Sequence, residues 1–198
     1  MRILVLSDTH GDISRAVNVY KKLIKKGPLD LIIHCGDLCS DAIKISEITG
    51  ARTAWVKGNC DGSFSDDDCL IVETEYGNLL ITHGHMQNVD FSQQNLYYMA
   101  EEKGCVAALF GHTHRAVSTE AGGIHLLNPG SLTKPRDGSN GTFGLIVTDT
   151  DYFRGTIYHY DKFMADGDDS GNSGEGGSKK PKVQGGYIRS LLNYSDRF

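Results

Sequence analysis

Short apolar runs alternate with helix-patterned segments through the first third of the chain, and no other feature restricts its fold as strongly. The apolar runs within residues 2–7, 29–37 and 53–59 predict strands. Between them, apolar residues recur at helical spacing over 13–26, and a shorter helix is expected near 41–49. This alternation predicts βαβ units, in which parallel strands are covered by helices.

The second half of the chain predicts hairpins rather than crossovers. Residues 70–84 have the pattern of a hairpin, with turn chemistry at Tyr76-Gly77-Asn78. A helix near 92–103 precedes an apolar strand at 106–112. Units of βαβ type followed by hairpins predict an α/β fold of two packed sheets with helices outside. Three further β-rich runs are expected, at 122–131, 142–149 and 152–160.

Composition divides the chain into three parts. Residues 1–164 carry the strand and helix patterns and form the expected domain. Residues 165–186 are rich in Gly, Ser and charged side chains, so we expect a flexible linker. Apolar residues at helical spacing over 187–198 predict a short amphipathic tail. This tail could dock on the domain or on a neighbouring subunit of a homo-oligomer, or be in part a segment added for expression.

Charge and cysteine content restrict the partners and the compartment. The 198 residues carry a formal net charge of −5, which argues against stable or non-specific nucleic-acid binding. A phosphate-bearing substrate stays open, because bound metal ions supply local positive charge. No run of about 18 apolar residues occurs, so neither a membrane span nor a membrane partner is expected. Five cysteines without a CxxC pair predict reduced thiols in the cytoplasm.

Seven side chains of metal-binding types follow predicted strands, each beside or close to a glycine. Taken alone, each is better explained by turn or capping chemistry. Sites in open α/β sheets gather at the carboxyl ends of strands, so the repetition predicts that these side chains converge. The residues are Asp8, His10, Asp37, Asn59, His83, His112 and His114.

The spacing of these residues suggests how they share metal ions. In extended backbone, residues i and i+2 point to the same side, so Asp8 and His10 could converge on one ion. His112 and His114 repeat this spacing after a strand expected to run parallel to the first. Asp37 offers two carboxylate oxygens and could bridge two ions. The sequence therefore predicts a centre for two divalent metal ions.

The ligand types indicate which metals and which reaction to expect. Carboxylate, imidazole and amide oxygen suit Mn²⁺, Fe or Zn²⁺ better than Ca²⁺. We expect Mn²⁺ first, with Fe, Zn or Ni as alternatives. Metal coordination lowers the pKa of water from about 15.7 to about 7, so a hydroxide bridging two ions could attack a phosphate ester at neutral pH. A hydrolytic enzyme is therefore the leading expectation.

In this order, the motifs resemble those of the calcineurin-like metallophosphoesterase superfamily over about residues 1–160. The NPGS segment at 128–131 is similar to the small bacterial and archaeal phosphodiesterase branch. The resemblance implies a four-layer α/β/β/α sandwich of two mixed sheets, and a phosphodiesterase for small-molecule or nucleotide substrates. It assigns one metal ion to Asp8, His10, Asp37 and His114, and the other to Asp37, Asn59, His83 and His112.

The chain departs from the family pattern at Cys60. Many relatives have Gly-Asn-His followed by an acidic residue, where this chain has Gly58-Asn59-Cys60-Asp61. The missing histidine is the usual candidate for protonating the leaving oxygen. A cysteine thiol, with a pKa of about 8.5, is a poorer acid in that role. We expect slow turnover of poor leaving groups unless His85 or a substrate group supplies the proton. Asp61 is expected to orient a neighbouring metal ligand.

Two other functions are open at this point. A phosphomonoesterase or nucleotide phosphatase would use the same metal chemistry. The fold is also similar to that of Vps29, a noncatalytic scaffold subunit of the eukaryotic retromer. The complete ligand set favours the enzyme, whereas Cys60 and the tail keep the scaffold open. Loops near 61–68, 86–92 and 131–141 are expected to set substrate specificity.

Overall fold

The computed structural model of the protein describes residues 1–62 and 69–166. The predicted tail at 187–198, most of the predicted linker at 165–186 and most of the loop at 61–68 lie outside these residues, so the predictions for them stay predictions. The described residues form ten strands and four helices.

The strands form two five-stranded sheets, each of which mixes parallel and antiparallel pairs. The first sheet has the order β10 (Tyr152–His159), β9 (Thr142–Asp149), β1 (Arg2–Leu6), β2 (Leu31–His34) and β3 (Thr53–Trp55). The second has the order β4 (Cys69–Glu73), β5 (Asn78–Thr82), β6 (Ala107–Leu109), β8 (Ile124–Pro129) and β7 (Ala116–Ala121).

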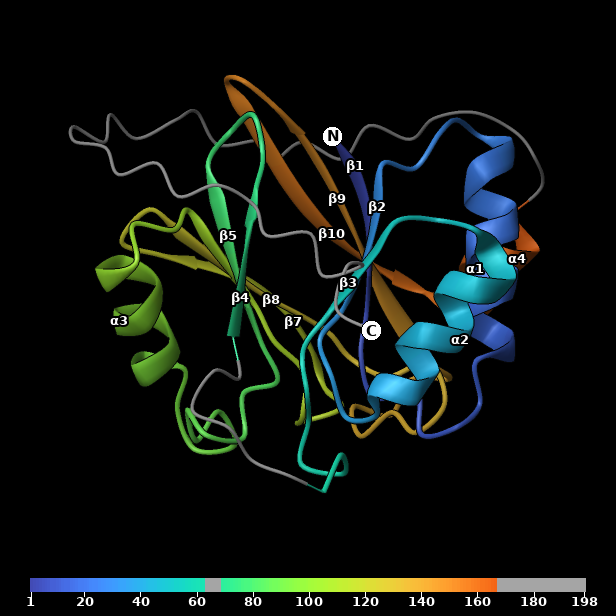
Figure 1. The fold of residues 1–198 in the computed structure, drawn as a ribbon, viewed down its shortest axis with the longest axis horizontal. Helices are drawn as coiled ribbons and strands as arrows, with labels where there is room; N and C mark the ends of the chain where they lie inside the picture. Colours follow the sequence, from blue (N-terminus) through green and yellow to red (C-terminus); the bar gives the residue numbers. More distant parts are fainter. Residues whose placement is uncertain (63–68, 167–198) are drawn as a thin grey trace.

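Helices cover the outer faces of both sheets. The first sheet is covered by α1 (Ser14–Lys25), α2 (Cys39–Thr49) and the short α4 (Tyr160–Ala165), and α3 (Gln94–Glu102) covers the second sheet on the opposite side (Figure 1). The expected four-layer α/β/β/α sandwich of two mixed sheets is therefore confirmed.

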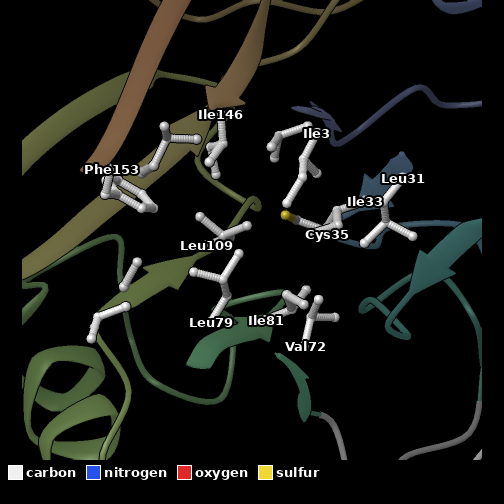
Figure 2. Packing of buried hydrophobic residues seen from close by; sticks show 14 of the residues in the cluster. Ile3, Leu31, Ile33, Cys35, Val72, Leu79, Ile81, Leu109, Ile146 and Phe153 are labelled. Carbon is white, nitrogen blue, oxygen red and sulfur yellow. The ribbon is translucent and has the colours of Figure 1, made fainter. Parts of the chain in front are cut away.

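Alternation along the central strands produces these layers. On β1, Ile3 and Val5 belong to the core between the sheets, whereas Leu4 and Leu6 pack with the α1 side chains. Leu79 and Ile81 on β5 face Ile3 and its neighbours across the same core (Figure 2), and Leu80 packs beneath α3. Each such side chain contributes about 1.5–3 kcal/mol when fully buried. Because both faces of these strands are covered, their sequences are apolar without interruption.

The structure differs from the sequence-based expectations in several strands and in one helix. Strand β6 pairs with β5 and β8 in the second sheet, so it is not a sheet neighbour of β1. Strand β7 was not expected, because most of its residues are exposed and polar. Helix α4 continues from β10 and was also not expected. Strands β2, β3 and β6 are shorter than predicted, because the residues after them turn into loops.

Two further features concern covalent structure and membranes. All five cysteines lie among the described residues, and none of them forms a disulfide. Within residues 1–62 and 69–166, none of the helices has the length and apolar character that crossing a bilayer requires.

Candidate metal centre

Five loops, which follow β1, β2, β3, β5 and β6, bring the seven predicted metal ligands together. Asp8, His10, Asp37 and Asn59 come from the first sheet, and His83, His112 and His114 come from the second. His10 Nε2 lies 3.0 Å from His114 Nε2, and His83 Nε2 lies 2.9 Å from Asn59 Oδ1. The candidate centre therefore spans the junction between the two sheets.

The backbone at this centre is left-handed rather than extended. Among the described residues, six non-glycine residues have positive φ, and five of them are predicted ligands: Asp8 (54°), His10 (49°), Asp37 (97°), His112 (67°) and His114 (56°). The expectation that extended backbone aligns residues i and i+2 is therefore wrong. Left-handed backbone costs about 1–2 kcal/mol per residue and persists where surrounding contacts enforce it, often at functional sites.

Buried hydrogen bonds enforce the first of these loops. The Asp41 carboxylate on α2 accepts hydrogen bonds from the Thr9 hydroxyl and the Gly11 amide, both at 2.7 Å. The Thr9 hydroxyl lies 3.1 Å from His34 Nε2, which can donate to it. Asp41 and His34 are both almost completely buried. Helix α2 and strand β2 thus hold the loop that carries Asp8 and His10.

This network predicts a pH-dependent stability. Burial lowers the pKa of His34 from 6.5 to about 4. Between these values the unfolded chain binds a proton that the folded chain does not, so stability is complete above pH 6.5 and falls as the pH approaches 4. Unfolding by urea in the presence of a chelator should show a loss of about 3 kcal/mol over this range. In His34→Gln the free energy of unfolding should depend less on pH. Parallel pH profiles for the wild type and the variant would contradict this prediction.

Asp8 has one carboxylate oxygen that fits a metal ion. Asp8 Oδ2 accepts hydrogen bonds from Ser7 Oγ at 2.7 Å and from the His112 amide at 3.0 Å. Asp8 Oδ1 is buried and has no hydrogen-bond partner among the described residues; His114 Nε2 lies 3.4 Å from it. A buried carboxylate oxygen without a partner is costly, and a bound cation would remove that cost.

The protonation of Asp8 suits the same role. Burial disfavours its charged form, but the contacts with His114, His83 and Ser7 outweigh burial, so the pKa of Asp8 is lowered. The contact with Asp8 raises the pKa of His114. Asp8 is therefore an anion near neutral pH, as a metal ligand requires.

Two of the histidines have the tautomer of metal ligands fixed by the backbone. His83 Nδ1 lies 2.8 Å from the Cys35 carbonyl, and His114 Nδ1 lies 2.7 Å from the Lys134 carbonyl. Since a carbonyl only accepts, both Nδ1 atoms donate, so the neutral form of each ring carries its lone pair on Nε2. Burial lowers the pKa of His83, so its ring stays neutral at pH 7.

The two ring nitrogens of His112 have different contacts from those of His83 and His114. Its Nδ1 lies 3.1 Å from Asn59 Oδ1, and its Nε2 lies 2.8 Å from a carboxylate oxygen of Asp90. The sequence interpretation missed Asp90, because nothing in the spacing of the motifs connects it with His112. It lies within the loop 86–92, for which only a role in specificity was expected.

Five of the seven predicted ligands fall into two overlapping groups. Within each group the ligand atoms lie within 4.8 Å of one another. Asp37 joins the groups as well, because its Oδ2 lies 2.9 Å from His10 Nδ1. This arrangement is compatible with two ions that share carboxylates. The groups are Asp8, His10 and His114, and Asp8, Asp37 and His83.

The three predicted catalytic residues lie at or near the centre. Cys60 is exposed, and a hydrogen bond with Asp37, followed by burial and nearby negative charges, raises the pKa of its thiol to about 11. The Asp61 carboxylate accepts hydrogen bonds from the amides of Gly58 at 2.9 Å and Cys39 at 2.8 Å, so it fixes the loop around Asn59. The centre of the His85 ring lies 5.4 Å from that of His83 and 6.1 Å from that of His112.

Comparison with known proteins identifies the family. The model of the calcineurin-like phosphoesterase superfamily domain matches residues 1–151. A probable metallophosphoesterase of Bacillus subtilis, YsnB, is 33% identical over 164 residues, which are 82% of this chain and 92% of that protein. The phosphodiesterase MJ0936 of Methanocaldococcus jannaschii is 30% identical over 173 residues, which are 78% of this chain and 97% of that one.

Solved structures agree with this comparison. A predicted phosphoesterase of Streptococcus pneumoniae has a TM-score of 0.67 and 31% identity, and the match covers 81% of this chain and 90% of that one. A mutant of Vps29 from Entamoeba histolytica has a TM-score of 0.67 at 24% identity over 80% of this chain and 92% of that one, which is a likeness of fold. Since the family model and the relatives span most of its length, this chain belongs to the calcineurin-like phosphoesterase superfamily.

Proposed function

We propose that this chain, a metal-dependent phosphoesterase by family, hydrolyses phosphate diesters of small molecules or nucleotides at a dinuclear centre that prefers Mn²⁺. The observation that carries the proposal is the convergence of all seven ligand side chains from five loops, with Asp8 Oδ1 buried and without a hydrogen-bond partner among the described residues. Relatives named as phosphodiesterases, such as YfcE of Escherichia coli at 27% identity, support diesters as the substrate class.

The candidate ligands would bind the metal ions, and their neighbours would hold the ligands in place. Asp8, Asp37 and the lone pairs on the Nε2 atoms of His83 and His114 would hold two divalent ions. Such ions supply a water nucleophile at neutral pH and positive charge for the phosphate. The contacts that fix the ligands from behind, such as the Cys35 carbonyl at 2.8 Å from His83 Nδ1, keep the site preorganised.

Hydrolysis of chromogenic esters tests this proposal. The apoprotein is prepared with a chelator, and the rates on bis(p-nitrophenyl) phosphate and p-nitrophenyl phosphate are measured before and after Mn²⁺ is added. We expect hydrolysis that depends on Mn²⁺, with the higher kcat/KM for the diester. A higher kcat/KM for the monoester would favour a phosphomonoesterase. The lack of any metal-dependent rate on either ester would favour the noncatalytic scaffold.

Cys60 predicts which leaving groups are turned over well. A thiol with its pKa raised to about 11 holds its proton at pH 7 but releases it poorly to a leaving oxygen. Cys60→His should therefore raise kcat on a dialkyl phosphate by about 10–100-fold, within the range of general acid catalysis. It should leave the rate on bis(p-nitrophenyl) phosphate almost unchanged, because that leaving group needs no proton. Cys60→Ser is the control, and equal rates for all three proteins on the dialkyl ester would contradict this role.

A further inference from the structure

In the described part of the chain, His112 is the one predicted histidine ligand in contact with a carboxylate that is not itself a predicted ligand, that of Asp90; His10 contacts the predicted ligand Asp37. The rings of His83 and His114 are fixed by backbone carbonyls, whereas the Nε2 of His112 lies 2.8 Å from Asp90 Oδ2. The Asp90 side chain is 50% exposed and that of His112 is 25% exposed. Of the four predicted histidine ligands, His112 thus depends on a side chain at the rim of the centre for its orientation.

We infer that Asp90 is a positioning residue that sets the affinity of the ion held by Asn59, His83 and His112. This inference rests on the proposed dinuclear centre. A carboxylate only accepts, so Asp90 favours the tautomer in which His112 Nε2–H donates to it and Nδ1 carries the lone pair; Nδ1 lies 3.1 Å from Asn59 Oδ1. A carboxylate behind an imidazole fixes its tautomer and rotation and makes it a stronger ligand. Asp90 lies on the other side of the ring from Nδ1, so it acts through His112 and does not bind the ion itself.

The loop that carries Asp90 is built to hold it in place. Asn88 is the sixth non-glycine residue with positive φ (56°) in the described part of the chain, and it is the one that is not a predicted ligand. Its turn is closed by hydrogen bonds from the Phe91 amide to the Asn88 carbonyl at 3.0 Å and from the Gln87 amide to the Gly84 carbonyl at 3.1 Å. Val89 is buried in the core beneath α3, directly before Asp90.

This arrangement connects two ligands through one segment. The loop begins directly after His83, passes the buried Val89 and ends with Asp90 against His112. Asn adopts left-handed backbone at little cost, so the turn at Asn88 is stable, and together with the buried Val89 it places Asp90 against His112.

A surface ion pair is the competing explanation for this contact. Exposed pairs contribute little to stability and need no function. Glu120 and His125 provide a matched pair of that kind: their contact is 3.5 Å long, and their side chains are 45% and 16% exposed. They lie on β7 and β8, paired directly across from each other and away from the ligand-bearing loops. Glu120→Ala is therefore the control for Asp90→Ala.

Metal binding by the full-length apoprotein decides between the two explanations. Titration with Mn²⁺ alone, in competition with a chromogenic chelator, gives two dissociation constants for the wild type. Asp90→Ala should weaken one of them by about 10–100-fold and leave the other unchanged. Asp90→Asn should have a smaller effect, because its amide oxygen still accepts the hydrogen bond. Glu120→Ala should change neither constant, and all variants should unfold at the wild-type temperature in chelator.

Repeating the Asp90→Ala substitution in a His112→Ala variant tests whether Asp90 acts through His112. In His112→Ala, the additional Asp90→Ala change should have no further effect on either dissociation constant. If the wild type binds two ions and Asp90→Ala binds both equally well, the role of Asp90 is refuted while the dinuclear centre stands. If Asp90→Ala weakens both ions equally, or acts equally in His112→Ala, the positioning role is also refuted. A wild type that binds fewer than two ions refutes the dinuclear centre, and the inference about Asp90 with it.

Discussion

Replacing Asp37 with alanine should lower the metal-dependent rate by about a thousandfold or more. Asp37 Oδ2 lies 2.9 Å from His10 Nδ1, and Asp37 shares a group of candidate ligand atoms with Asp8 and His83. Asp8 belongs to both groups of candidate ligand atoms, and Asp37 connects them as well through its contact with His10. Loss of metal-supplied charge stabilisation costs several kcal/mol, and about 4 kcal/mol corresponds to a thousandfold in rate.

The same substitution should not weaken the fold of the apoprotein. Asp37 is 2% exposed, and its carboxylate lies close to that of Asp8, so the two negative charges repel each other without metal. In chelator, Asp37→Ala should unfold at the wild-type temperature or above it. The exposed Asp149→Ala is the control for activity and should leave the metal-dependent rate unchanged. A rate for Asp37→Ala within tenfold of the wild type would contradict the role of Asp37.

Replacing Gly58 with alanine should cause the largest loss of stability among single changes around the centre. A Cβ on Gly58 would lie 2.2 Å from the Asp37 amide nitrogen and 2.3 Å from its Cα. Both atoms belong to the backbone, so no side chain can move aside to relieve the clash. We expect the free energy of unfolding to fall by about 3 kcal/mol or more, which is at the upper end for overpacking. Urea unfolding in chelator measures this loss.

Gly104 separates a steric clash from the general effect of removing a glycine. It has a positive φ of 64°, and a Cβ there would meet nothing within 4 Å. Gly104→Ala should therefore cost only the left-handed strain of about 1–2 kcal/mol and leave metal binding unchanged. Gly58→Ala should also weaken Mn²⁺ binding, since it displaces Asp37. Equal losses in the two variants would show that close packing against Asp37 is unimportant.

Much of the fold could be predicted, because apolar periodicity reports burial directly. The continuous apolar runs of β1 and β2 indicated strands covered on both faces, and the hairpin of β4 and β5 followed from its turn residues. The apolar periodicity of β7 is weak because most of its residues are exposed. The position of β6 in the second sheet depends on tertiary packing, which no local pattern encodes.

The candidate site was predicted from residue types, whereas its geometry was not. Motif order identified the seven candidate ligands that the structure brings together, but the left-handed backbone of five of them is enforced by partners distant in sequence, such as Asp41 behind Thr9. Asp90 was missed for a similar reason. An isolated acidic residue in a loop carries no local signal, and only the folded chain places it against His112.

The junction at which the centre lies has a mechanical consequence. Four of the candidate ligands lie on loops of the first sheet and three on loops of the second, and an apolar layer that contains Ile33 and Leu109 packs between the two sheets (Figure 2). The thickness of that layer sets the separation between the two sets of candidate ligands. Because protein interiors are packed as densely as crystals, a change of one methylene in this layer shifts the two sets relative to each other. Activity should therefore respond to substitutions of buried residues in this layer that do not contact the candidate ligands. Any metal bound at the centre should in turn hold the two sheets together.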